Sequence, residues 1–162
     1  MKIALSTDHA GLELTNRLEA FLTAQGHECA NFGPKSFDPD DDYPDFIFPA
    51  ARAVASGECE VGIIMGGSGQ GEAMAANRVK GVRCALFYGP VAPKGAIDAE
   101  GDTSSNPYEI LRLTREHNLA NMLSLAARFL SWEEIEKAVT TWLATPQGSA
   151  ERHVRRVQKL DQ

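Results

Sequence analysis

The sequence predicts an α/β protein, a Rossmann-like doubly wound three-layer sandwich with a five-stranded parallel sheet. Three observations predict this fold class. Short apolar runs alternate with longer segments of helical periodicity, which is the pattern of consecutive βαβ units. The chain enters such an apolar run almost at its first residue. A later run, 61–65, leads through a glycine-rich turn into an alanine-rich segment, the order of strand, turn and helix.

Each expected element has its own signal in the sequence. Strands are expected where a short run is mainly apolar, and helices where apolar residues recur every three or four positions. Leu14, Leu18 and Phe21 form such a stripe in the first expected helix, and we assign them to core packing. The expected strands are 2–6, 28–31, 61–65, 83–87 and 122–125. The expected helices are 11–25, 45–56, 72–77, 108–117 and 132–144.

Length and composition limit the classes of protein that remain. With 162 residues the chain is expected to be one domain, 1–162, and its net charge of −6 argues against nucleic acid as a partner. Its three cysteines, Cys29, Cys59 and Cys84, are far apart, so neither a zinc site nor a disulfide framework is expected. No signal peptide precedes the first expected strand and no apolar run reaches the length of a membrane span. We therefore expect a cytoplasmic protein without membrane association.

The glycine-rich turn between Gly66 and Gly71 is the most informative feature. Glycines let the backbone approach a ligand closely, and amides at the start of a helix attract anions. Glu72 stands where the turn meets its helix, so one carboxylate would lie beside an anion-binding turn. Such a pair suits proton abstraction next to a carbonyl, with the amides holding the enediolate oxygen. A plain strand-to-helix connection is the simpler reading. A dinucleotide site or a P-loop fits poorly, because the required spacings are absent.

Two further segments lie after expected strands, where parallel sheets bind ligands. The acidic run Asp38–Asp42 looks like a metal site, but three of its carboxylates are consecutive and point in different directions. We favour a solvated loop and no metal. The stretch 88–107 has no periodicity and is rich in Pro, Gly and Ser. A loop of this length is usually a functional lid or a disordered insertion.

Five motifs together resemble the type B ribose-5-phosphate isomerase family, which includes the galactose-6-phosphate isomerase subunits and related pentose- and tetrose-phosphate isomerases. The resemblance covers the chain apart from about 88–107. One such motif would be weak, whereas five in the same order are specific. In chain order they are Asp8-His9-Ala10-Gly11, Asp42-Tyr43-Pro44-Asp45, Gly66-Gly67-Ser68-Gly69-Gln70-Gly71-Glu72 with Ala75-Ala76-Asn77, Arg115-Glu116-His117-Asn118 with Ala120-Asn121, and Arg152-His153-Val154-Arg155-Arg156-Val157.

The resemblance implies an aldose–ketose isomerase that acts on a phosphorylated sugar through a cis-enediolate, without metal or cofactor. It also implies a homodimer whose active sites take residues from both subunits, with a C-terminal tail at about 148–162 reaching the partner; dimer against tetramer stays open. One branch of the family has a cysteine base at the end of the third strand, where this chain has Gly66. The other branch has a glutamate after the turn, which Glu72 matches. The resemblance therefore assigns the base to Glu72.

Other roles come from the same resemblance. His117 would open the sugar ring, Ser68 would help the turn amides to stabilise the enediolate oxygen, and the arginines would hold the phosphate. The implied substrate contacts are Asp8, His9, Tyr43, Gly67, Gly69, Gly71, Asn77, Asn118, Arg128, Arg152 and Arg156. The role of His153 stays open.

Several of these residues have plainer readings that the sequence leaves open. Asp8 could cap the first helix, His117 could sit favourably at a helix C-terminus, and the arginines could be surface charges. Glu72 could be a first-turn carboxylate, and its pKa could shift either way, because burial and the helix N-terminus act in opposite directions. Tetrose, pentose and hexose phosphates all remain candidate substrates. A non-catalytic sugar-phosphate sensor is the alternative, which a retained Glu72 and His117 argue against.

Overall fold

The computed structural model describes residues 1–160, and the chain in it divides into two compact units. The sheet unit consists of Met1–Tyr88 with Asn121–Ser131, and the helical unit of Gly89–Ala120 with the residues from Trp132 onward. Asp161 and Gln162, the end of the expected C-terminal tail, lie outside the described residues. The expectation of a single domain stays a prediction, and each unit is described by itself.

The sheet unit contains the expected five-stranded parallel sheet, with strand order β2-β1-β3-β5-β4. Every expected strand agrees with an observed one to within one residue. Strands β3 and β5 are buried along their whole length, which explains why their sequences are almost entirely apolar instead of alternating. The strands are β1 Lys2–Thr7, β2 Glu28–Asn31, β3 Val61–Gly66, β4 Cys84–Phe87 and β5 Met122–Ala126.

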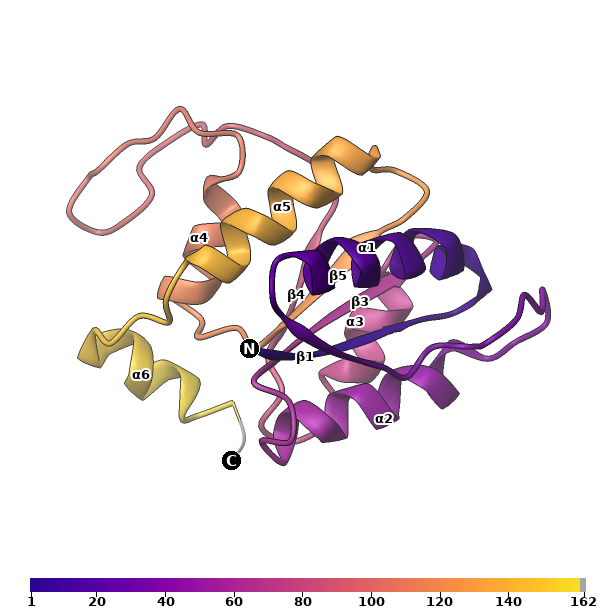
Figure 1. The fold of residues 1–162 in the computed structure, drawn as a ribbon. Coiled ribbons are helices and arrows are strands. Elements are labelled where there is room, and N and C mark those ends of the chain that lie inside the picture. Colours follow the sequence, from indigo (N-terminus) through magenta and orange to yellow (C-terminus); the bar gives the residue numbers. More distant parts are fainter. Residues whose placement is uncertain (161–162) are drawn as a thin grey trace. The chain divides into compact units, whose positions relative to one another are not determined.

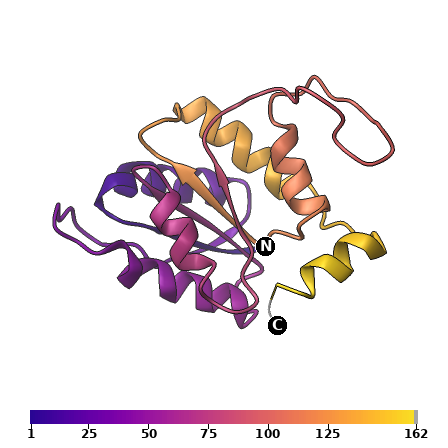
Figure 2. The same ribbon diagram turned by 180° about the vertical axis from the view of Figure 1, so that it is seen from behind.

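Helices cover both faces of this sheet, as predicted. Figure 1 shows α1 (Leu12–Ala24) on one face and α2 (Tyr43–Ala55) with α3 (Gln70–Ala76) on the other. Seen from behind in Figure 2, α2 and α3 lie side by side. Small alanines of α2 and α3 pack with Ile47 and Ile64 into one buried cluster, which brings these helices close to the strands.

The helical unit contains α4 (Glu109–Glu116), α5 (Trp132–Ala144) and α6 (Glu151–Val157). The fully buried Trp142 of α5 donates its indole N–H to Thr114 Oγ1 at 3.1 Å, which ties α5 to α4. Arg115 lies over the same ring, 4.7 Å from its centroid, and donates to the carbonyl of Thr145. The long segment after β4 has neither helix nor strand as far as α4, as expected.

Candidate active site

The carboxyl ends of β1, β3 and β5 bring the predicted residues of the sheet unit to one edge of the sheet, because parallel strands end on the same side. Asp8 and His9 follow β1, the glycine turn follows β3, and Arg128 follows β5. The backbone N–H of Arg128 donates to Gly67 O at 3.1 Å. A β-carbon added to Gly67 would lie 3.3 Å from Arg128 Cζ, so the guanidinium lies against the turn.

The turn needs glycine for two physical reasons. Gly69 caps α3 with φ of 71°, a left-handed conformation that side chains rarely adopt. A β-carbon there would also approach the carbonyl oxygen of Leu125 and Ser124 Oγ to 3.0 Å. The same Ser124 hydroxyl donates to Gly69 O at 2.7 Å and fixes the turn on β5. Ser68 Oγ accepts from the N–H of Gln70 at 3.3 Å, which leaves its own proton available to a ligand.

Glu72 is only 5% exposed, and its carboxyl group fills the space beside Gly66. A β-carbon built on Gly66 would collide with all three atoms of that carboxyl group. Burial raises the pKa of Glu72, the negative charge of Asp8 also raises it, and a hydrogen bond to the backbone N–H of Glu72 opposes both. The sequence left the direction of the Glu72 pKa shift open. In the structure the pKa is raised, toward the range that a general base needs at neutral pH.

This pKa shift has a consequence for stability that can be measured. Between the unfolded pKa of Glu72 and its raised native value, the native state binds more protons than the unfolded state, so the wild type loses stability as pH rises. Gln does not titrate. Glu72→Gln should therefore gain stability relative to the wild type as the pH rises from about 4.5 toward neutrality, in urea unfolding at fixed protein concentration. A difference that stays constant or reverses would contradict the raised pKa.

His9 is held by Asp41, a residue that the sequence placed in a solvated acidic loop. The two share a 2.6 Å contact between Nδ1 and Oδ1, and Asp41 Oδ2 accepts from the His9 N–H at 3.0 Å. The Asp41 side chain is 7% exposed, so the prediction of a solvated loop was wrong for this residue. The bond to Asp41 raises the pKa of His9, against burial, which lowers it. A His9 that stays protonated to higher pH suits an anionic ligand.

The same residues are the one cluster with metal-ligand geometry that residues 1–160 contain. Ligand atoms of Asp8, His9 and Asp41 all lie within 4.8 Å of one another. Both oxygens of Asp41 already bind His9, and Asp8 Oδ1 accepts from the N–H of Ala10 at 2.9 Å at the start of the short 3₁₀ turn His9–Gly11. Asp8 thus does cap this turn, and the hydrogen bonds explain the cluster as a support for His9.

Of the two predicted contact residues Tyr43 and Asn77, Tyr43 lies against the glycine turn, whereas the side chain of Asn77 bonds to the backbone of α3 and β4. The Tyr43 ring lies against the turn, because a β-carbon on Gly71 would approach Tyr43 Cζ to 2.9 Å. The Asn77 amide instead joins the end of α3 to β4, since its Nδ2 donates to the carbonyls of Ala73 and Cys84 and its Oδ1 accepts from the N–H of Cys84. Both amide hydrogens are used, so Asn77 has no donor left for a substrate.

The helical unit brings together the other predicted residues. His117 ends α4, and its ring stacks on that of His153 with centroids 4.3 Å apart and planes 10° apart. Both histidines, Asn118 and Arg156 line one hollow of about 300 Å³. His153 is 7% exposed and accepts from Arg152 Nε at 3.2 Å. Burial lowers the pKa of His153, as do His117 and the two arginines. His153 is thus a neutral support for His117, a role that the sequence left open.

The structure therefore describes two groups, each within its own unit. In the sheet unit the turn, Glu72, His9, Tyr43 and Arg128 lie at one edge of the sheet. In the helical unit, His117, Asn118 and Arg156 share the hollow, whereas Arg152 turns to Glu100 of the long loop. Neither Asp41 nor Glu100 was predicted, and the sequence contains no signal that pairs them with His9 and Arg152.

Comparison with known proteins identifies the family of this chain. Residues 3–98 and 105–160 match the family described as Ribose/Galactose Isomerase. The chain belongs to this family. Membership places it among the aldose–ketose isomerases. The internal gap in the match, residues 99–104, lies within the long loop. Within residues 1–160, no helix is both long and apolar enough to cross a membrane.

Individual relatives of this isomerase agree over nearly their whole length. Ribose-5-phosphate isomerase B of Mycolicibacterium paratuberculosis is 36% identical over 160 residues, covering 99% of this chain and 89% of that protein. The structure of Clostridium thermocellum ribose-5-phosphate isomerase B aligns with a TM-score of 0.83 at 35% identity, covering 99% and 95% of the two chains. That of the Mycoplasma genitalium enzyme with bound ribulose-5-phosphate aligns with a TM-score of 0.81 at 34% identity, covering 98% and 93%.

Proposed function

We propose that this isomerase interconverts ribose 5-phosphate and ribulose 5-phosphate, or a related tetrose or hexose phosphate, through a cis-enediolate. The observation that carries the proposal is the buried Glu72 carboxyl group in the space beside Gly66, next to the glycine turn. A base with a raised pKa beside backbone donors is what proton transfer next to a carbonyl requires. The relatives named ribose-5-phosphate isomerase B favour the pentose phosphate.

In the proposed mechanism each group moves or holds a defined atom. His117 opens the sugar ring by moving a proton between the ring oxygen and the C1 hydroxyl. Glu72 removes the proton from C2, and the electron pair forms the cis-enediolate, whose oxygen is stabilised by the amides of Gly67–Gly71 with Ser68. Glu72 then returns the proton to C1, and the hydroxyl proton at C2 passes to the oxygen at C1. Hydrogen bonds polarise the carbonyl, so the step needs no cofactor.

His9, Arg128 and the arginines of α6 would hold the phosphate. Arginine forks match phosphate oxygens, and a protonated His9 adds positive charge. Asp8 and Asn118 would contact sugar hydroxyl groups. The proposed substrate is a charged phosphate ester, which fits the cytoplasmic location expected from the sequence.

The proposal includes a homodimer in which the Glu72 group of one subunit faces the His117 group of the other. The sheet unit has exposed apolar side chains that suit a subunit contact: Met74 is 65% exposed and Phe129 is 62% exposed. The Phe129 ring lies 5.5 Å from that of Tyr88, and β4 is an edge strand with β5 as its neighbour. Dimer and tetramer are both compatible with this surface.

A substrate panel tests the proposed function. Four-, five- and six-carbon aldose and ketose phosphates are incubated with the protein, and the product ratio is followed to equilibrium in both directions. We expect turnover with at least one pair, with ribose 5-phosphate and ribulose 5-phosphate as the first candidates. Saturable binding of these compounds without turnover would instead identify a sugar-phosphate sensor.

Shared sites predict complementation between two inactive chains. One chain carries Glu72→Gln and the other Arg152→Ala with Arg156→Ala. At a substrate concentration well below the raised KM of the arginine variant, each homodimer is expected to be nearly inactive. If the sites are shared, a mixed dimer regains one intact site, and roughly a quarter of the wild-type activity should return in a statistical mixture of subunits. Differently tagged chains allow mixed dimers to be purified before assay. No recovery in verified mixed dimers would show that each chain builds its own site.

A further inference from the structure

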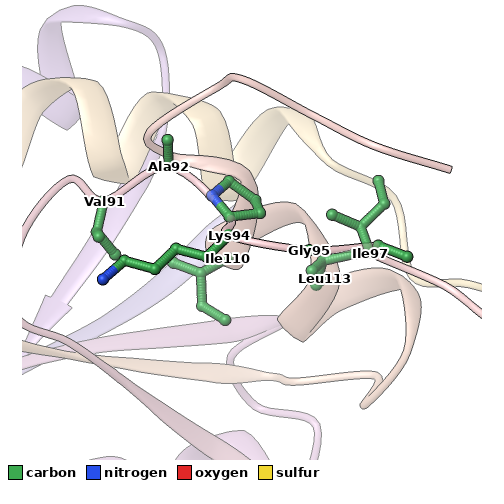
Figure 3. Close-up of a pocket in the computed structure, with 9 residues that line it drawn as sticks. Val91, Ala92, Lys94, Gly95, Ile97, Ile110 and Leu113 are labelled. Atoms are coloured by element: carbon green, nitrogen blue, oxygen red, sulfur yellow. The ribbon is translucent and has the colours of Figure 1, made fainter.

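The long loop is ordered by its own hydrogen bonds and by α4. The Val91 N–H donates to Pro107 O, and the Ile97 N–H donates to Asp102 O, both at 2.8 Å. Figure 3 shows Val91 and Ile97 on the loop beside Ile110 and Leu113 of α4, where together they line a hollow of about 280 Å³. The base of the loop is thus tied to α4, which ends at Glu116, directly before His117.

The tip of this loop is a tight turn that carries Glu100. Asp98 Oδ1 accepts from the backbone N–H groups of Glu100 at 3.1 Å and Asp102 at 2.9 Å, which forms a tight turn around Glu100. Glu100 lies in the segment 99–104 that falls outside the family match.

Glu100 forms an ion pair with the guanidinium group of Arg152. Its two carboxylate oxygens accept from Arg152 Nη1 and from Arg152 Nη2, the latter at 2.9 Å, in a bidentate pair. The remaining Nε of Arg152 donates to His153. The bond from Arg152 lowers the pKa of Glu100 to about 2, so the carboxylate is charged at every pH at which an isomerase would be assayed. All three nitrogens of Arg152 are thus engaged inside the helical unit.

Arg156 differs from Arg152, although the two lie one helical turn apart on α6. Arg156 lines the hollow with His117 and Asn118 and is exposed. Its guanidinium has no ion pair among residues 1–160. A planar guanidinium offers a phosphate the same two-pronged geometry that it offers a carboxylate. A phosphate can therefore bind Arg156 directly, but it has to displace Glu100 before it can bind Arg152.

We propose that Glu100 is a positioning residue that sets substrate affinity by competing with the substrate's phosphate for Arg152. The inference rests on the proposed function, in which the arginines of α6 hold that phosphate. Glu100 acts through Arg152 and touches no reacting atom, so it should change substrate affinity and leave the chemical step alone. The pair is exposed, with side chains 37% and 56% accessible, so the competition is modest and salt should weaken it.

Calorimetric titration of ribose 5-phosphate into the full-length protein measures the competition without requiring turnover. Glu100→Gln should bind about two- to fivefold more tightly than the wild type, the range over which an exposed ion pair can compete. In a double-mutant cycle, Arg152→Ala should weaken binding more in the Glu100→Gln background than in the wild type, by at least about twofold. In steady-state assays, KM should change while kcat stays within about twofold.

Two matched variants separate competition from a general charge effect. Arg156→Ala should weaken binding by the same factor in both backgrounds, because Glu100 does not hold Arg156. Asp102→Asn removes an equal charge from the same loop. The Asp102 carboxylate has no described hydrogen bond or ion pair within residues 1–160. In this background, Arg152→Ala should weaken binding by the same factor as in the wild type.

The proposal would be overturned if Arg152→Ala weakened sugar-phosphate binding by the same factor in the wild-type and Glu100→Gln backgrounds. It would also be overturned if Glu100→Gln bound the sugar phosphate more weakly than the wild type. Turnover of the wild type is measured in parallel. If the wild type turns the sugar phosphate over but Arg152→Ala weakens binding equally in the two backgrounds, only the competition by Glu100 is contradicted. If Arg152→Ala weakens binding unequally but the wild type shows no turnover, only the proposed reaction is contradicted.

Discussion

Glu72→Gln is expected to lower kcat by at least about a hundredfold with little change in KM, the usual size of a general-base effect. The amide keeps the shape of the carboxyl group beside Gly66 but cannot accept the proton from C2. Initial rates with ribose 5-phosphate at saturating concentration, together with calorimetric binding of the same sugar, measure the two quantities separately. Near-normal turnover would remove Glu72 as the base.

Two controls make this result specific. Glu109→Gln alters another buried glutamate, 2% exposed and bound by Ser104 and Arg112, and should leave kcat near the wild-type value. Thiol-blocking reagents should leave most of the activity, because burial raises the pKa of Cys29, Cys59 and Cys84 and keeps all three thiols protonated. Strong inactivation by such a reagent would point to a cysteine base.

Gly66→Ala is expected to lower kcat by about a hundredfold, although it removes no functional group. The added β-carbon would take the space of the Glu72 carboxyl group, which must rotate away. Displacing a catalytic group by about 1 Å can cost a rate factor of this size. Because the colliding atoms are the end of a flexible side chain, the protein should still fold, with a thermal midpoint close to that of the wild type.

Gly95→Ala is the matched control, since an added β-carbon there meets nothing within 4 Å. It should have wild-type kcat. If Gly66→Ala were equally active, the carboxyl group beside Gly66 would not be the position from which Glu72 acts.

The order of strands and helices could be predicted because it depends on local patterns. The apolar runs gave every strand to within one residue, and the stripe in 132–144 gave α5 with its observed ends. Helix starts were less accurate, because they depend on backbone conformation. α2 begins two residues before the expected start, with a proline tolerated in its first turn, and α3 begins at Gln70, directly after the left-handed Gly69.

The residues of the candidate site could be predicted, but the side chains that hold them in place could not. His9 and Asp41 are 32 residues apart, and Arg152 and Glu100 are 52 apart, so each contact depends on the path of a loop that has no periodicity. The pKa direction of Glu72 was equally out of reach. It depends on how deeply the side chain is buried, which local sequence does not specify.

The collision between a side chain at position 66 and the carboxyl group of Glu72 also constrains how such an enzyme can evolve. A chain with this backbone has room for one base, either at the end of β3 or on α3. Replacing Gly66 by cysteine alone would displace the existing base, and replacing Glu72 alone would leave none. Each single step passes through an impaired intermediate, so the two positions are epistatic and should change together.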